Sequence, residues 1–249
     1  MLNTIKSSIK QAIFSKYFLV GFIGVIVVIF ISSISNVIEA FRAGESLMKG
    51  FHNEFINKAV VSEGMVLALP VIAALPFTAS VVNDVKSGFI RYYVHRTSRR
   101  YYLIGKCMAG IISGGLVIVL GMVASYVIAF LMLVPREASA SKEAEWVAFN
   151  IKFVKSVVLM FLSGAFWSMC GLTLATATNS KYMAYASPFI VYYVLIILYE
   201  RYFNKWYILY PKKWINPSFA WSGALFLFGL IIGISVVFYY VAKRRVFKT

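Results

Sequence analysis

The chain has 249 residues, of which 61% are hydrophobic and 14% are charged, and its formal net charge is +16. An average soluble domain carries roughly 25% charged residues, so this composition, with a mean hydropathy of +0.79, excludes an ordinary soluble domain and indicates an integral membrane protein. We expect no nucleic-acid partner, because anionic lipid headgroups attract basic residues that lie next to membrane spans.

The first predicted element is an amphipathic helix over residues 1–16. Its apolar side chains recur at helical spacing and its lysines occupy the other face, as in a helix that lies on the inner membrane surface before the first span. A frayed tail is the alternative interpretation. The apolar positions are Leu2, Ile5, Ile9, Ala12 and Ile13, and the lysines are Lys6, Lys10 and Lys16.

Six apolar segments follow, and each contains a run without Asp, Glu, His, Lys or Arg. These runs have roughly the 20 residues that a helix needs to cross the bilayer. They are continuous and do not alternate with period two, so they predict an all-α fold and exclude a barrel. We treat residues 1–249 as a single transmembrane domain. The predicted spans lie at about 17–38, 64–82, 103–134, 153–178, 182–199 and 219–241.

Prolines and small residues shape these spans. Pro70 and Pro76 lie in the second span and Pro188 in the fifth, and we expect kinks there because each proline removes one helical hydrogen bond. Small residues four positions apart let helices approach closely. We interpret these pairs as packing within the chain, and a dimer seam is the alternative. The pairs are Gly110/Gly114, Gly121/Ser125, Gly164/Ser168 and Gly229/Gly233.

The distribution of basic residues predicts the orientation. With the N-terminus inside, the inner segments carry 14 Lys and Arg and the outer segments carry 11. Because Lys and Arg are enriched in cytoplasmic loops, both termini are expected in the cytoplasm. Asp84 is then the only acidic residue on the inner side.

Three connections fall on the predicted outer side. Residues 39–63 form a charged, partly amphipathic connection, and 135–150 are interpreted as a solvated loop with a short helical end. Residues 199–221 are rich in aromatic side chains, which are typical of the membrane interface. We predict an aromatic belt there, and a short re-entrant segment broken at Pro211 and Pro217 is the alternative.

Several functional motifs are missing from the sequence. It contains no GxxxxGK[ST] phosphate loop, no HExxH and no Cys/His cluster, and Cys107 and Cys170 are interpreted as buried small hydrophobic residues. We therefore expect that the chain is not an enzyme by itself and binds no cofactor or metal. Ion-coupled transporters usually carry ionisable residues inside their spans, so energy for any uphill transport would have to come from a partner.

The stretch from 84 to 100 interrupts the apolar sequence with five Lys and Arg residues. Ser87 is predicted to cap a short helix that begins at Gly88, and Ser98 to cap the next helix. The short helix would lie exposed on the cytoplasmic side, with one aromatic and basic face suited to binding another protein. A mere topology signal is the alternative. The face consists of Phe89, Tyr92, Tyr93 and Arg96.

This stretch resembles the loop between the second and third spans in the permease subunits of type-2 ABC exporters. Members of that family typically carry an acidic residue, basic residues and a glycine, then a short coupling helix, a Ser-Arg break and a Gly-Lys. The present sequence has Asp where Glu is usual and His-Arg-Thr where Thr-Pro often stands. The matching positions are Asp84, Lys86, Gly88, FIRYYVHR, Ser98-Arg99 and Gly105-Lys106.

The resemblance implies a transmembrane permease subunit in the bacterial cell membrane. Two such chains, as a homodimer, would surround a central path, and each would place its coupling helix on a cytoplasmic ATPase subunit that binds ATP and Mg. The cargo would be amphipathic or hydrophobic, with a peptide toxin or bacteriocin first and a drug or lipid next. The implied ATPase-coupling interface consists of Asp84, Lys86, Gly88, Phe89, Tyr92, Tyr93, Arg96, Ser98 and Arg99.

A second function class remains open on the sequence. The chain could be a non-transporting membrane protein, such as an immunity factor or a scaffold that binds a toxin or another partner. Such a protein would need no ATPase, and the aromatic and basic face would then contact lipid.

Overall fold

The computed structural model describes residues 2–35, 38, 50–93, 98–137, 143–203, 205–206 and 210–246. Every regular element in these ranges is a helix. The elements are α1 (Leu2–Ile13), α2 (Lys16–Ser32), α4 (Phe51–Val61), α5 (Glu63–Ala74), α6 (Ser80–Lys86), α7 (Phe89–Tyr93), α8 (Arg99–Leu133), the 3-10 turn η1 (Val134–Arg136), α9 (Glu143–Thr178), α10 (Lys181–Arg201), α11 (Pro211–Trp214), η3 (Pro217–Phe219) and α12 (Ala220–Val246).

Among the described helices, four are long and apolar enough to cross a membrane, namely α8, α9, α10 and α12. They lie where the third to sixth spans were predicted. Two bent pairs, α1 with α2 and α4 with α5, raise the number to six if each pair crosses as one broken span. The chain is therefore an all-helical, multi-pass membrane protein with four to six candidate spans.

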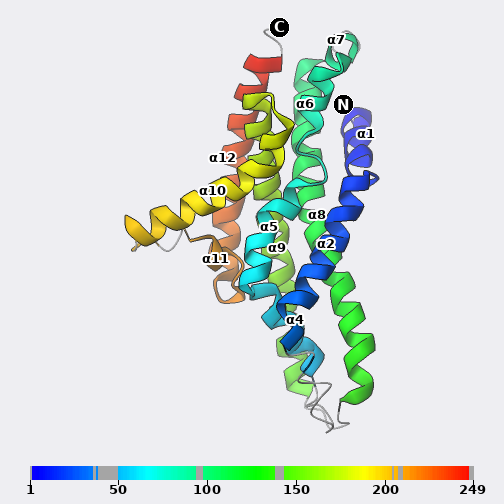
Figure 1. Cartoon of the computed structure of the whole chain (residues 1–249), viewed down its shortest axis with the longest axis vertical. Coiled ribbons are helices and arrows are strands. Elements are labelled where there is room, and N and C mark those ends of the chain that lie inside the picture. The colour runs from blue at the N-terminus through cyan, green and yellow to red at the C-terminus, as the bar shows by residue number, and fades with distance from the viewer. Residues whose placement is uncertain are drawn as a thin grey trace.

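The helices form a bundle around α8 and α9, which lie side by side along its length (Figure 1). α1 and α2 pack on α8, whereas α10 and α12 pack on α9. The close approach of α8 and α9 requires small residues, because a Cβ atom at Gly114 would lie 2.8 Å from the carbonyl oxygen of Gly164. The prediction of packing within the chain is thus confirmed for this pair of helices. At Gly229 and Gly233, in contrast, an added Cβ would meet no described atom within 4 Å.

The second predicted span, 64–82, is not one continuous helix. α5 ends at Ala74, a turn over 75–79 contains Pro76, and α6 begins at Ser80. α5 has 12 residues and is therefore about 18 Å long, which is shorter than the hydrocarbon core of a bilayer. Pro70 lies inside α5 without ending it, so the chain breaks only at the second proline.

Part of the predicted outer connection 39–63 belongs to the core, which corrects the sequence interpretation. α4 buries Phe55 and Ile56 in the main hydrophobic cluster. At Ser62 the backbone is extended, and the hydroxyl accepts a hydrogen bond from the Met65 N–H at 3.3 Å, so α5 starts in a new direction. The axes of α4 and α5 differ by 64°. Residues 39–49 lie outside the described part of the chain.

The N-terminal amphipathic helix is present as α1. It ends at Ile13, and Ser15 caps α2 by accepting a hydrogen bond from the Phe18 N–H at 3.0 Å. The two axes differ by 51°. The small and apolar face of α1, which includes Ala12, packs with Phe77 and Ala109. This apolar face therefore has a partner inside the chain. The position of α1 on the membrane surface stays a prediction.

The aromatic segment before α12 both faces outward and enters the core. Trp206 and Trp221 are exposed to 64% and 81%, as expected for a belt at the interface. Trp214 in α11 is only 4% exposed and stacks on Trp167 of α9 with ring centroids 5.9 Å apart. The segment therefore turns into the bundle at α11.

Within the predicted loop 135–150, α9 begins at Glu143, so the expected helical end is continuous with the fourth predicted span. The start of α1, the short helix α7 and the end of α12 lie at the same end of the bundle (Figure 1). We call it the α7 end. The opposite end carries α4, the end of α8 and the start of α9.

Candidate functional site

The candidate site is the α6–α7–α8 connection at the α7 end, and a glycine sets its path. Gly88 has φ +72°, in the left-handed region that terminates helices and favours glycine. Ser87 is the C-cap of α6, with φ −79° and ψ −5°. Its hydroxyl donates a hydrogen bond to the Asp84 carbonyl oxygen at 3.4 Å. The prediction that Ser87 caps the next helix is wrong.

α7 is a five-residue helix with two different faces. Tyr92 is 81% exposed and Phe89 is 47% exposed, so these two predicted interface residues share the outer face. Ile90 is buried and packs in a cluster with Tyr102 and Leu103 of α8. The inner face therefore fastens α7 to the bundle and leaves the aromatic face open.

A buried ion pair lies behind α7. The Lys106 ammonium donates to Asp84 Oδ2 at 2.8 Å, and the side chains are only 4% and 14% exposed. The Tyr102 hydroxyl donates to the same oxygen at 2.8 Å. Lys106 also lies over the ring of Phe77, 4.8 Å from its centroid. Two hydrogen bonds and an aromatic face thus compensate charges that would be costly to bury alone.

This cluster connects three elements of the bundle. Asp84 lies on α6, Tyr102 and Lys106 lie one turn apart on α8, and Phe77 lies in the turn before α6. On the other side of α8, a Cβ at Gly105 would lie 3.4 Å from the Ser8 hydroxyl of α1. α1, α6 and α8 are therefore packed together directly beneath α7.

Sequence reasoning missed the partners of Asp84. The resemblance assigned Asp84 to the docking interface, whereas the structure directs its carboxylate toward α8 and buries most of it. Tyr102 was not singled out at all, and Lys106 entered only as part of the Gly-Lys pattern. The available signal was that a single acid on the inner side and a single lysine at the start of an apolar run both need a partner.

The remaining predicted residues lie around the base of α7. Ser98 caps α8 as predicted, because its hydroxyl accepts the Tyr101 N–H at 3.5 Å. Lys86 and Arg99 are exposed on either side of the loop. The backbone of Tyr93 ends α7, and Arg96 lies outside the described residues. The structure thus brings Phe89 and Tyr92 to an exposed face and places Asp84 behind it.

A small cavity of about 170 Å³ lies next to Asp84. The Ser80 hydroxyl in its wall is buried and has no hydrogen-bond partner among the described atoms. The lining comes from the α1–α2 junction, the 75–79 turn, α6 and α10. The lining residues are Gln11, Ser15, Tyr17, Leu75, Pro76, Phe77, Ala79, Ser80, Asn83, Asp84 and Tyr185.

The described residues contain no group of three or more His, Cys, Asp or Glu side chains that could hold a metal ion. Cys107 and Cys170 are both free thiols. What this site offers is an exposed aromatic helix on a rigid, ion-paired base, an arrangement for binding a partner. No protein-family model, curated protein or solved structure matches the chain.

Proposed function

We propose that the chain is the transmembrane subunit of an ATP-driven exporter of the ABC type, with α7 as its coupling helix. The observation that carries the proposal is the exposed aromatic face of α7. It lies at the end of the bundle that also carries the start of α1 and the end of α12, with the basic residues Lys243, Arg244 and Arg245. Aromatic residues are enriched among the side chains that dominate protein interfaces. In this proposal the α7 end is cytoplasmic and the membrane is that of a bacterial cell.

The contacts of α7 with α6 and α8 support a mechanical role for α7. A force on α7 would pass through Ile90 to α8, and through Gly88 to α6. The Asp84–Lys106 pair connects α6 to α8, and separating these buried charges would be costly. α7, α6 and the first turns of α8 would therefore move together when the ATPase closes, as a rigid-body switch requires.

We assign part of the cargo-binding site to the cavity beside Asp84. Tyr17, Phe77 and Tyr185 in its wall come from the first, second and fifth predicted spans, and such aromatic side chains suit an amphipathic or hydrophobic cargo. Its volume of about 170 Å³ is below the roughly 300–1,000 Å³ of small-molecule sites. In this state it would take only part of a cargo, such as one apolar side chain of a peptide, and a second copy of the chain would complete the path.

Co-purification tests the proposal. The tagged chain is extracted from native membranes, and the eluate is searched for an ATPase subunit with a Walker phosphate loop. We expect that subunit to co-elute with the wild-type chain and to be depleted with Tyr92→Ala. Tyr202→Ala is the matched control, because Tyr202 is 72% exposed and lies outside the coupling site. Absence of an ATPase from every eluate would favour the alternative, a non-transporting immunity or scaffold protein.

A further inference from the structure

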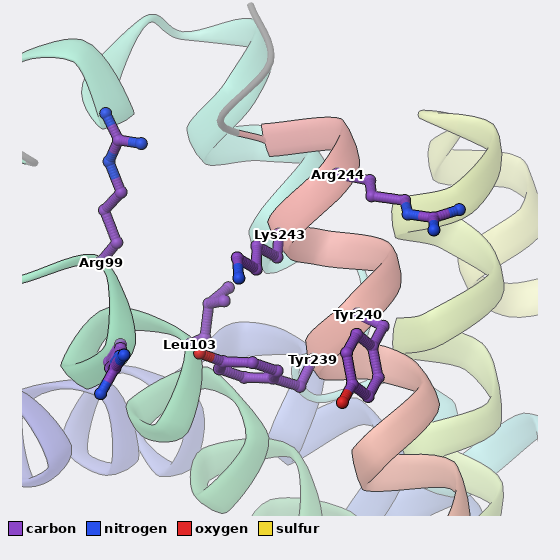
Figure 2. A pocket seen from close by; sticks show the side chains of 7 residues that line it. Arg99, Leu103, Tyr239, Tyr240, Lys243 and Arg244 are labelled. Atoms are coloured by element: carbon purple, nitrogen blue, oxygen red, sulfur yellow. The ribbon is translucent and has the colours of Figure 1, made fainter.

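A second cavity, of about 540 Å³, lies at the α7 end between the first turns of α8 and the last turns of α12 (Figure 2). Four of its seven lining residues are Lys or Arg, and none is acidic. This cavity is separate from the proposed cargo cavity, and it is not explained by the proposed coupling interface. Its lining consists of Arg99, Arg100, Leu103, Tyr239, Tyr240, Lys243 and Arg244.

The two helices bring their charges together from opposite ends. Lys243 and Arg244 lie in the last turn of α12, where cations are favourable. Arg100 lies in the first turn of α8, where the exposed N–H groups already make the helix end positive. No carboxylate of a described residue forms an ion pair with Arg100, Lys243 or Arg244. This cavity therefore concentrates positive charge that an anion would balance.

Figure 2 shows how the labelled side chains of this cavity lie. Lys243 and Tyr239 extend from α12 toward Leu103 of α8, which lines the cavity and is only 2% exposed. Arg244 extends to the other side of α12. A ligand between the two helices would thus meet Lys243 of α12, and Arg100 of α8 lines the same cavity.

The surface below the cavity is apolar and open. On α12, Val236, Val237 and Tyr240 are 49%, 51% and 62% exposed, and on α8 Ile104 and Met108 are also exposed. Tyrosine is typical of the boundary between lipid tails and headgroups. The cavity thus begins where these exposed apolar residues end, and in a bilayer such a boundary lies near the lipid phosphate groups.

From this arrangement we infer that the cavity binds the phosphate headgroup of an anionic phospholipid. The lipid phosphate would lie between Arg100 and Lys243, and its acyl chains would follow the exposed apolar surfaces of α8 and α12. Basic pockets between membrane helices are suited to such headgroups. The exposed apolar residues next to the cavity favour a membrane lipid over a soluble phosphate, which would gain nothing from them. This site does not depend on the proposed transport function.

The test measures phosphatidylglycerol bound to the purified full-length chain in detergent, by native mass spectrometry across a lipid titration. Each basic residue near an anionic lipid strengthens binding roughly five-fold, so the Arg100→Gln/Lys243→Gln variant should bind about 30-fold more weakly. The matched control is Lys152→Gln/Lys155→Gln, which removes the same charge near the start of α9, at the opposite end of the bundle. Equal losses in the two variants would overturn the proposal.

Two further measurements keep the outcome interpretable. If the double variant does not fold, Lys243→Gln replaces it, with an expected loss of roughly five-fold. An unchanged affinity in that variant would count against the site. Inorganic phosphate at millimolar concentration should not displace phosphatidylglycerol from the wild-type chain. Full displacement would assign the cavity to a soluble anion and overturn the lipid assignment.

Discussion

Glu137, just beyond α8, and His52, in the first turn of α4, form a buried contact although 85 residues separate them in sequence. The distance from His52 Nδ1 to Glu137 Oε1 is 2.7 Å, and the two side chains are 3% and 6% exposed. The carboxylate also accepts the backbone N–H groups of Gly50 and His52, each at 2.9 Å. The His52 ring packs edge-on against Phe130. This contact fixes α4 to the end of α8.

The contact predicts a loss of stability in acid. Burial raises the pKa of Glu137, but the hydrogen bonds from His52 and Gly50 lower it more, so the pKa in the folded chain is below its usual value of 4.5. A depressed carboxyl pKa contributes stability that is present above the unfolded value and lost as the pH falls through the folded value. The apparent melting temperature should therefore fall below about pH 4.5. In Glu137→Gln it should start lower and fall less steeply, and parallel pH profiles would contradict this account.

The buried Asp84–Lys106 pair predicts strong coupling between two mutations. Asp84→Asn leaves the Lys106 ammonium buried without its counter-charge, which should destabilise the chain by about 3 kcal/mol. Lys106→Gln should have a similar effect on the Asp84 carboxylate. The double variant should be less destabilised than the sum of the single variants, because neither charge is then unpaired. Unfolding of all four proteins in the same detergent measures this, and additive losses would show that the pair does not contribute.

The two faces of α7 predict different consequences of truncation. Phe89→Ala/Tyr92→Ala removes the exposed face and should weaken ATPase binding at least 30-fold, since interface hot spots contribute about 2 kcal/mol or more. Stability should change little. Ile90→Ala instead removes a buried contact with α8 and should lower the apparent melting temperature with less effect on binding. Binding titrations of the co-purified ATPase and thermal unfolding separate the two, and equal effects on binding would leave the loop as a topology signal.

The distribution of basic residues predicts which positions are accessible from outside. In a background without Cys107 and Cys170, cysteines introduced by Ser7→Cys, Thr97→Cys and Lys248→Cys should be protected from an impermeant thiol reagent in intact cells. Ser141→Cys should react. Labelling is measured before and after permeabilisation of the membrane, so that an unreactive site is distinguished from an inaccessible one. Reaction at position 97 in intact cells would reverse the proposed orientation.

Much of the helical architecture could be predicted from the sequence by itself. In lipid, every backbone N–H and C=O group must be satisfied within the segment, so a long run of apolar residues has to be a helix. α8, α9, α10 and α12 lie where uncharged runs predicted them. The cap at Ser98 and the small-residue packing at Gly114 and Gly164 were also predictable, because each depends on residues at fixed local spacing.

The tertiary structure decided what depends on residues far apart in the chain. α4 contains charged residues, so its buried face cannot be recognised from the sequence. Tryptophan is typical of the membrane interface, but Trp214 packs on Trp167 inside the bundle. Asp84 and its partner Lys106 lie on different helices, and the basic cavity is lined by the start of α8 and the end of α12. Neither feature can therefore be recognised from residues at a fixed local spacing in the sequence. Burial and charge pairing across helices are set by three-dimensional packing, and for that reason only the folded chain reveals them.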